Sequence, residues 1–322
     1  MTPALEAGAP LTAAPPESAP GRIAVSRCLL CGSERADALF VEPPHTVVRC
    51  VSCGLVWVTP RFTERSLGAV YDEGYWRSTA PRARGYADYR REQPLYLKTF
   101  RRRLGIVRRH VTGPGTLLDV GCAAGFFMQV MREEGWTVYG VEPSAGIVAH
   151  AREQLGLDTI HVGTLHDAPY AAGTFDLVTL WDVVEHVPDP ITLLRRARDL
   201  LAPEGVLILE TQDVDSPVAR LLGRRWHHFK HDEHLYHFGR STVRALLARA
   251  GLRVVETTHG SAGKYVSLGF VAERAARVHR VLSRLLQPLA RAEQANLYVN
   301  LGDELIVVAR PDRADRGGRP GT

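Results

Sequence analysis

One run of nine residues constrains the fold of this chain more than any other: Leu117–Gly125, which reads LLDVGCAAG. An apolar segment precedes it and an amphipathic one follows, the order expected of a strand, a tight turn and a helix. Gly121 and Gly125 would let the turn bend sharply and approach a ligand without interference from a Cβ atom. The simpler alternative is a strand–helix turn that binds nothing. Cys122 is expected to fill space in the turn.

Short apolar runs alternate with amphipathic ones on both sides of this turn. Strands are predicted at 116–120, 137–141, 159–162, 175–180, 206–210, 252–258 and 304–309. Helices are predicted at 95–110, 126–134, 144–155, 190–201 and 241–250. Strands that alternate with helices of this length predict an α/β fold with a parallel sheet covered on both faces.

Two carboxylates narrow the choice of ligand. A dinucleotide-binding turn would read G-x-G-x-x-G, whereas this chain has G-x-x-x-G preceded by Asp119. An acid at this position would repel a phosphate but could engage a cationic aminoacyl group. Glu142 ends the next predicted strand, about 20 residues after Gly121, where a carboxylate can accept both hydroxyls of a ribose.

Four motifs occur in order: LLDVGCAAGFF, VYGVEPS, FDLVTLWDVVEHVPDP and LAPEGVLILET. Together they resemble class I S-adenosylmethionine (SAM)-dependent methyltransferases over roughly residues 95–310. The resemblance implies a Rossmann-like seven-stranded sheet with an antiparallel last strand. It implies that Asp119, Gly121 and Gly125 contact the methionine part of SAM and that Glu142 binds the ribose.

The same resemblance places adenine near Gly163, Thr164 and Leu165, with Trp181 and Asp182 lining the pocket. Members of the family often carry an aspartate near position 164, where this chain has threonine. That departure makes the adenine contact the weakest part of the comparison.

The N-terminal region contains two C-x-x-C pairs, Cys28/Cys31 and Cys50/Cys53, separated by 18 residues. Each pair can aim two thiolates at one point, and two such turns make a closed tetrahedral zinc site. Four protein ligands leave no position for water, so the predicted zinc is structural. The alternative is a set of ordinary thiols.

This front end, CLLCGS…VVRCVSCGLVWVTPRF…VYDEGYW, resembles a bacterial methyltransferase group that includes sugar C-methyltransferases. The chain ends soon after the predicted SAM domain, without the large C-terminal domain of those sugar enzymes. We therefore expect methyl transfer to oxygen, with a sugar, a glycan or a small secondary metabolite as acceptor. Histidine is the expected general base, because it titrates near neutral pH.

Two places supply histidine at the expected ligand-binding edge of the sheet: His186 and the histidine-rich stretch 226–238. Glu233 and His234 match a Glu-His pair of the sugar methyltransferases. Either His186 or His234 is the predicted base, with Glu233 orienting it or holding a substrate hydroxyl. These histidines could instead pack and hydrogen-bond the loops.

A metal is a further alternative for this stretch. His227 and His231 are spaced i, i+4, and His231, His234 and His237 are three apart, so on a helix they could converge on an ion. The stretch has poor helix signals, which argues against this alternative.

Residues 266–292 are predicted to form a long helix with a basic face. Such a helix could lie on an anionic membrane or pack against the pocket or another subunit, and packing is preferred. Tyr75 could close over the pocket as a lid, although core packing suits it better.

The predicted organisation is a tail at 1–22, the zinc module at 23–60, an aromatic and helical lid and linker at 61–110, the methyltransferase domain at 111–310 and a second tail at 311–322. Residues 1–22 lack the basic start and apolar core of a secretory signal, and no run of 18 apolar residues occurs, so a cytoplasmic protein is expected. The net charge is +5 and diffuse, which makes nucleic acid an unlikely partner. The sequence does not indicate an oligomeric state.

Two other functions stay open at this stage. One is an RNA methyltransferase that uses the zinc module to hold RNA. The other is a scaffold that binds SAM without catalysis. The intact set of Asp119, Gly121 and Glu142 favours SAM binding in every case.

Overall fold

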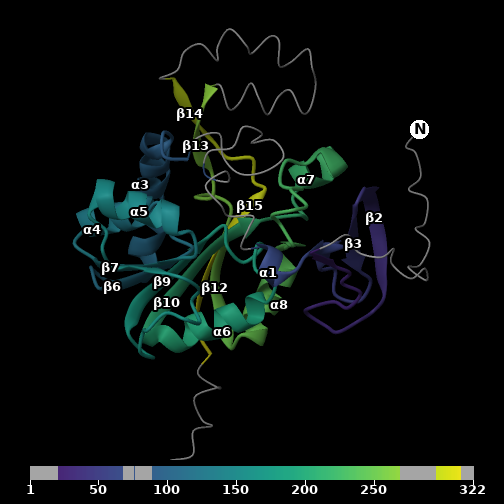
Figure 1. The fold of residues 1–322 in the computed structure, drawn as a ribbon, viewed down its shortest axis with the longest axis horizontal. Coiled ribbons are helices and arrows are strands. Elements are labelled where there is room, and N and C mark those ends of the chain that lie inside the picture. The colour runs from purple at the N-terminus through teal and green to yellow at the C-terminus, as the bar shows by residue number, and fades with distance from the viewer. Residues whose placement is uncertain (1–20, 68–75, 77–88, 269–294, 313–322) are drawn as a thin grey trace, which may run out of the picture.

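The computed structural model describes residues 21–67, 76, 89–268 and 295–312. Their main feature is a seven-stranded sheet in the order β12-β15-β10-β9-β6-β7-β8 (Figure 1). Its strands are β6 (Thr116–Val120), β7 (Thr137–Glu142), β8 (Ile160–Val162), β9 (Phe175–Trp181), β10 (Leu201–Gln212), β12 (Leu252–Thr258) and β15 (Glu304–Pro311).

Six of these strands run in the same direction, and β15 runs antiparallel to both of its neighbours, β10 and β12. The α/β class, the seven strands and the antiparallel last strand predicted above are therefore confirmed. The central strands are apolar on both faces because helices cover both. In β9, for example, every residue except Asp176 is buried.

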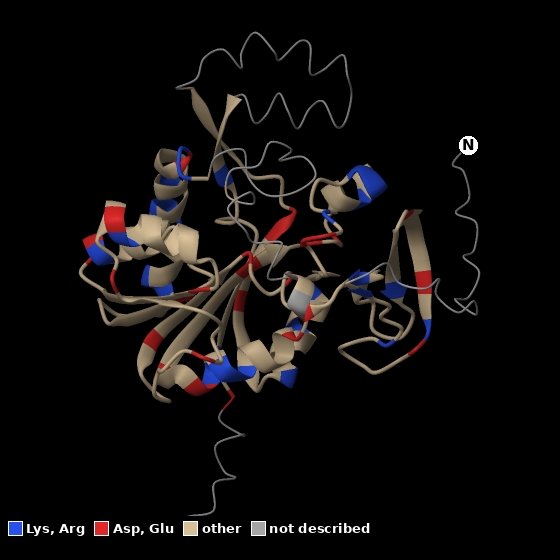
Figure 2. Ribbon diagram, viewed as in Figure 1, with Lys and Arg blue, Asp and Glu red and all other residues tan. Residues whose placement is uncertain are grey.

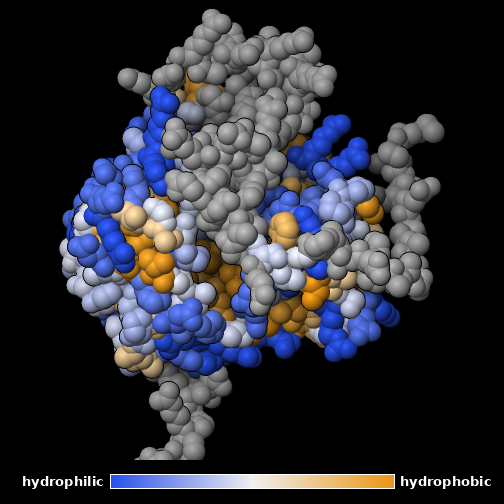
Figure 3. All heavy atoms as spheres, in the orientation of Figure 1, coloured by the Kyte–Doolittle hydropathy of each residue, from blue (hydrophilic) through white to orange (hydrophobic). Residues whose placement is uncertain are grey.

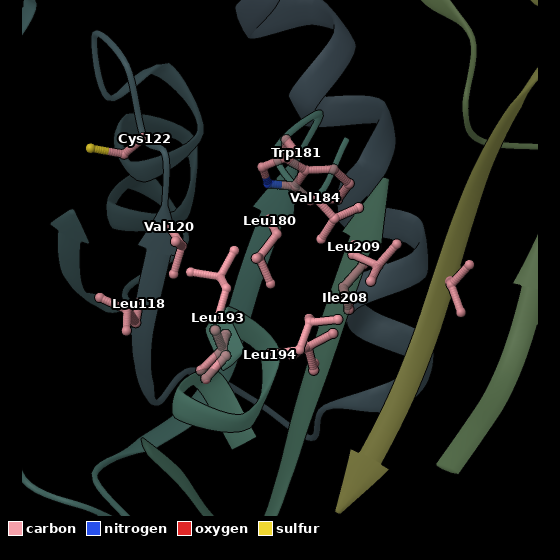
Figure 4. Packing of buried hydrophobic residues seen from close by; sticks show 14 of the residues in the cluster. Leu118, Val120, Cys122, Leu180, Trp181, Val184, Leu193, Leu194, Ile208 and Leu209 are labelled. Carbon is pink, nitrogen blue, oxygen red and sulfur yellow. The ribbon is translucent and has the colours of Figure 1, made fainter. Parts of the chain in front are cut away.

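Helices from the two halves of the chain cover opposite faces of the sheet, with α3, α4 and α5 on one and α6 and α8 on the other (Figure 1). Their bounds are α3 (Gln93–His110), α4 (Phe126–Glu133), α5 (Ala145–Leu155), α6 (Pro190–Leu200) and α8 (Arg240–Arg249). Local signals fix the start of α6. The Asp189 side chain, at the N-cap, accepts from the Thr192 amide at 3.0 Å, and Pro190 is the first residue of the helix. The packed apolar layer includes Leu180, Leu194 and Ile208 (Figure 4).

A second, four-stranded sheet in the order β11-β4-β3-β2 lies to one side of the first (Figure 1). It comprises β2 (Ala36–Glu42), β3 (His45–Cys50), β4 (Val56–Thr59) and β11 (Tyr236–His237). A pair, β1 (Arg22–Ile23) and β5 (Arg61–Phe62), flanks it. The edge strand β11 comes from the histidine-rich stretch, so the cysteine region and that stretch share one sheet.

This junction also has its own apolar core. It joins Val47 and Val58 of the cysteine region to Val214, Ala219 and Trp226, which follow β10. The cysteine region thus buries its apolar side chains against the loop that carries the histidines. The intervening segments are α1 (Glu64–Leu67), α7 (Pro217–Leu222) and the 3-10 turn Gly223–Arg225.

The predicted helix 266–292 is wrong at its start. Val266 and Ser267 belong to β13 (Lys264–Ser267), which pairs antiparallel with β14 (Asn296–Val299). Ladder hydrogen bonds to a strand far along the chain outweigh the local apolar period there. Residues 269–292, and with them the proposed membrane contact, lie outside the described residues.

Within the described ranges, no helix has both the length and the apolar character required to cross a bilayer.

Candidate active site

The site is located by a reversal of strand order. From β6 the chain moves outward through β7 and β8, then returns to β9 on the other side of β6. Ligands of open α/β sheets bind beyond the carboxyl ends of the strands at such a point. Asp119, Glu142, Asp182 and His186 all lie at this edge, at the ends of β6, β7 and β9 or just after.

The turn after β6 requires glycine at both of its predicted positions. Gly121 has φ +70° and Gly125 has φ +75°, in the left-handed region. A Cβ on Gly121 would lie 2.8 Å from Cγ2 of Val183, and one on Gly125 would collide with Leu157. The turn therefore brings main-chain atoms close to the space beyond the strand ends.

Glu142 is held by that turn. One carboxylate oxygen accepts from the Ala123 amide at 3.1 Å and the other from the Ser144 amide at 3.0 Å. Each oxygen keeps a lone pair for a further donor. Burial raises the pKa of Glu142 to about 7, against the effect of the two amides.

Asp119 is the second buried acid of this half of the edge. Its carboxylate accepts from the Thr179 hydroxyl at 2.6 Å. Burial raises the pKa of Asp119 to about 7, and the nearby charge of Glu142 adds to the rise. Two neighbouring carboxyls whose pKa values are raised would both gain from a cationic ligand.

The turn after β8 carries the residues expected near adenine. The Gly163 amide donates to the Glu142 carbonyl at 3.1 Å, and Leu165 is buried. The Thr164 hydroxyl donates to Asp167 at 2.6 Å, and these hydrogen bonds lower the pKa of Asp167. A carboxylate thus stands three residues after the position where the family often has one.

The side chains of Trp181 and Asp182, at the end of β9 and just after it, have different surroundings. Trp181 packs into the core, with its ring centroid 5.0 Å from that of Phe127 and the Arg103 guanidinium 4.8 Å from its own (Figure 4). Asp182 has φ +55° and forms an ion pair with Lys264 at 2.8 Å.

Lys264 and Arg103, which the sequence reasoning missed, anchor a charge network that is buried at Arg103 and partly exposed at Lys264. Lys264 also contacts Glu304 at 2.8 Å, and Arg103 contacts Glu210 at 2.6 Å. Burial lowers the pKa of Lys264, but Asp182 and Glu304 outweigh that effect and raise it well above its ordinary value. Acidic positions gather near the start of β15 in Figure 2. The available signal was the rarity of lysine, which occurs three times in the chain.

Histidines form the other half of the edge. The His186 and His234 rings lie edge to face, with centroids 4.7 Å apart. His186 Nδ1 lies 2.9 Å from the backbone carbonyl of Glu233, and the Glu233 carboxylate contacts Lys230 at 3.2 Å. Glu185, also missed, is buried here and accepts from the Thr211 hydroxyl at 3.0 Å.

The surroundings of both imidazoles lower their pKa values and so favour the neutral form. Burial lowers the pKa of His186, while the charges of Glu233 and Asp182 oppose the shift. Burial lowers the pKa of His234 much further, with His186 and Lys230 adding to the effect. Gln212 Nε2, whose orientation is set by a 3.1 Å hydrogen bond to the Tyr236 carbonyl, lies 3.4 Å from His234 Nδ1.

Backbone hydrogen bonds connect this cluster to the cysteine region. The Leu235 amide donates to the Glu185 carbonyl at 2.8 Å, and the Val58 amide donates to the Leu235 carbonyl at 3.1 Å. In β11, His237 pairs with Val56 of β4. The histidine segment is thus fixed between the end of β9 and the second sheet.

The four N-terminal cysteines converge as the spacing predicts. Cys28 Sγ lies 3.4 Å from Cys53 Sγ, Cys31 Sγ lies 3.5 Å from Cys50 Sγ, and all four sulfurs lie within 4.8 Å of one another. The amides of Gly32 and Gly54 close equivalent turns on the carbonyls of Cys28 and Cys50. Thiolates around one tetrahedral zinc stand roughly 3.8 Å apart, so the donor set fits zinc.

Trp76, from the aromatic stretch before α3, reaches the turn that holds Glu142. Its indole Nε1 donates to Ser144 Oγ at 2.9 Å, and its ring is buried. Tyr75, the predicted lid residue, lies outside the described residues. Apolar surface is exposed near the middle of this face of the molecule (Figure 3).

The fold and this edge define the class of the protein. The family described as "Methyltransferase domain" matches residues 89–257, more than half of the chain. The chain therefore belongs to this methyltransferase family.

Curated relatives narrow the comparison. A ubiquinone biosynthesis O-methyltransferase of Xanthomonas campestris pv. campestris (strain B100) is 32% identical over 145 residues, covering 40% of this chain and 61% of that protein. The protein of the same name in Ruegeria pomeroyi is 40% identical over 99 residues, covering 30% of this chain and 40% of its own length. The similarity thus spans only part of each relative.

One solved structure is similar over most of the chain. The 1,6-didemethyltoxoflavin-N1-methyltransferase of Burkholderia thailandensis, with S-adenosylhomocysteine bound, has a TM-score of 0.50 and 16% identity. The similarity covers 85% of this chain and 98% of that one. At this identity it supports the shared fold alone.

Proposed function

We propose that the protein transfers a methyl group from SAM to a hydroxyl oxygen of a small acceptor. The observation that carries the proposal is the carboxyl edge of the sheet, where Asp119 and Glu142 stand on one side of the reversal point and His186 stands on the other. SAM, when bound, supplies an electrophilic methyl group on a sulfonium sulfur.

The donor half would bind SAM through its two acids and its glycine turn. Glu142 has one free lone pair on each oxygen for the two ribose hydroxyls, because the Ala123 and Ser144 amides occupy the others. Asp119, beside Gly121 and Gly125, would face the cationic aminoacyl end. A cation there would draw the pKa values of both acids down from about 7.

The adenine would lie over Gly163, Thr164 and Leu165, with Asp167 supplying a carboxylate close to that turn. Asp182 would form the wall between donor and acceptor, and Trp181, packed in the core, would support it. The 2.8 Å ion pair between Asp182 and Lys264 would hold that wall in place.

His186 suits the role of general base better than His234. A neutral His186 that donates Nδ1–H to the Glu233 carbonyl carries its basic lone pair on Nε2, the atom that would take the proton. The acids Glu233 and Asp182 favour the imidazolium that forms. The hydroxyl oxygen would attack the methyl carbon directly, the sulfur would leave with the bonding pair, and His186 would take the hydroxyl proton.

His234 and Glu233 would then be positioning residues. The Gln212 amide faces His234 Nδ1, and a backbone hydrogen bond with His228 also engages the ring. His234 packs edge to face on His186 and would set its plane, while Glu233 sets its tautomer.

Oxygen as the acceptor atom is supported by the name that the curated relatives share, O-methyltransferase. A sugar, glycan or hydroxylated small metabolite is the acceptor class that we propose. Cys28, Cys31, Cys50 and Cys53 would hold a structural zinc, which stabilises the sheet that fixes the histidine segment.

The test is methyl transfer from labelled SAM. Purified protein would be incubated with labelled SAM and separate pools of sugar nucleotides, lipid-linked glycans and hydroxylated aromatic compounds. Base-stable label in one pool, with stoichiometric release of S-adenosylhomocysteine, is expected. Label that enters RNA, or SAM binding without transfer to any pool, would contradict the proposal.

A further inference from the structure

A second group of imidazoles and carboxylates lies on the same edge of the sheet, next to the His186 cluster: the His228 ring stacks on that of His234 with centroids 6.1 Å apart. His227 Nε2 is 3.8 Å and His228 Nε2 is 3.9 Å from Oδ2 of Asp303. One ligand atom from each of the three residues lies within 4.8 Å of the other two. The i, i+4 spacing instead predicts that His227 pairs with His231, but His231 contacts Glu42 at 3.2 Å.

The donor set has the composition of a transition-metal site. Two imidazoles and one carboxylate suit zinc, cobalt(II) or iron(II) and leave coordination positions open. Ligand atoms around one such ion stand roughly 3 to 3.5 Å apart at bond lengths of about 2.1 Å. The observed separations therefore need to close by about half an ångström, which the turn that carries the histidines can supply.

The Asp303 carboxylate is oriented by a hydrogen bond from a buried neighbour. The buried Trp226 indole donates to Asp303 Oδ2 at 2.8 Å, the kind of contact that fixes a metal-binding carboxylate. Glu304 adds a fourth possible ligand, with Oε1 3.5 Å from His228 Nε2. The side chain of His227 is 26% exposed and that of Asp303 is 5% exposed, so an ion can enter from the His227 side of a largely shielded site.

We infer that His227, His228 and Asp303 bind one divalent transition-metal ion, in addition to any zinc held by the cysteines. The site stands at the carboxyl edge, because Glu304 pairs with Gln212 at the end of β10. The inference concerns metal binding alone and does not depend on the proposed methyl transfer.

The probe is cobalt(II). Full-length protein would be equilibrated with cobalt(II), passed through a desalting column and analysed for metal per chain. Thiolate-to-cobalt charge-transfer absorption arises only from the cysteines, whereas an imidazole and carboxylate site gives only weak ligand-field bands. Two ions per chain are expected, of which one contributes no charge-transfer absorption.

Two variants and a control assign that second ion. His228→Ala removes one ligand, and Asp303→Asn removes the charge while its amide oxygen still accepts from Trp226. His110→Gln is the control, because His110 contacts Glu256 at the end of α3, away from the site. We expect each ligand variant to bind cobalt(II) at this site at least tenfold more weakly, since one ligand or its charge is lost, and the control to match the parent.

The charge-transfer band is expected to stay unchanged in all the proteins. If His228→Ala does not fold, as judged by circular dichroism, Asp303→Asn decides the question. A parent that binds only the cysteine-coordinated ion would overturn the inference. So would a second ion that persists in the folded ligand variants, or one that His110→Gln also loses.

Discussion

The two halves of the sheet edge are built differently. In the donor half, Asp119 and Glu142 belong to one βαβ unit, and main-chain amides of adjacent turns hold Glu142. In the acceptor half, His186 is held by a segment about 47 residues further along the chain. The residues proposed to bind SAM are thus held by local backbone geometry, while those proposed to face the acceptor are assembled from distant segments.

The halves also differ in charge compensation. Burial leaves Asp119 and Glu142 each with a pKa of about 7, a state that a cationic ligand would relieve. Two other acids near this edge have cations of their own: Lys264 contacts Asp182, and Arg103 contacts Glu210. Asp119 and Glu142 would thus gain a counter-charge from the cationic ligand proposed above, whereas Asp182 and Glu210 already have one.

The largest expected effect is on the rate of methyl transfer, when His186 is replaced. His186→Ala should lower kcat for methyl transfer by roughly 10²- to 10⁴-fold, because the base is lost, and leave S-adenosylhomocysteine affinity within about threefold. In the parent, kcat should rise with pH through the acidic limb below pH 6.5, because burial lowers the pKa of His186, and be level above it.

His234→Gln serves as the matched control for His186→Ala. It should reduce kcat less and keep the acidic limb, since it changes a positioning residue. Equal losses in the two variants, or a limb that persists in His186→Ala, would remove His186 from the role of base.

Replacing one residue of the cysteine cluster is expected to lower methyl transfer by a smaller factor. Cys50→Ser should release the metal and lower methyl transfer by roughly 10- to 100-fold, as loss of a supporting shell does. The β4–β11 pairing carries the change to the histidine segment, whereas the donor half has no strand in that sheet. Calorimetry with S-adenosylhomocysteine should therefore change little. A parallel loss of cofactor affinity would show that the halves are not separate.

The smallest expected effect is on stability. The folded-state pKa of Asp119, about 7, lies above its unfolded value, so the folded protein keeps a proton that the unfolded chain loses between about pH 4 and 7. This group therefore makes the free protein less stable as pH rises through that window. Asp119→Asn should lose less unfolding free energy than the parent between pH 5 and 8, by on the order of 2 kcal/mol. Denaturant titrations at both pH values test this, and identical pH dependences would count against a buried, shifted Asp119.

The same contrast explains what the sequence could predict. The bounds of β6 and β12 were predicted because apolar periodicity is local. The residues proposed to bind SAM could be singled out because they lie within one short stretch. Lys264 and Arg103 were missed because their partners, Asp182 and Glu210, are 82 and 107 residues away. No local pattern reports such pairings.

The strand at 264–267 was missed for the same reason, since its partner β14 lies beyond residues 269–294. The pairing of β11 with β4 links residues about 180 positions apart, and only the fold brings them together. The cysteine cluster lies between these cases: the C-x-x-C spacing predicted its geometry, while its attachment to the histidine segment could not be read from spacing.

The most direct test of the account is calorimetric titration of metal-loaded protein with S-adenosylhomocysteine near neutral pH. The account predicts saturable binding of one molecule per chain in the parent. It predicts at least about 100-fold weaker binding in folded Glu142→Ala, because two hydrogen bonds to a charged group are lost. No heat from the parent, or equal affinity in the two proteins, would contradict it.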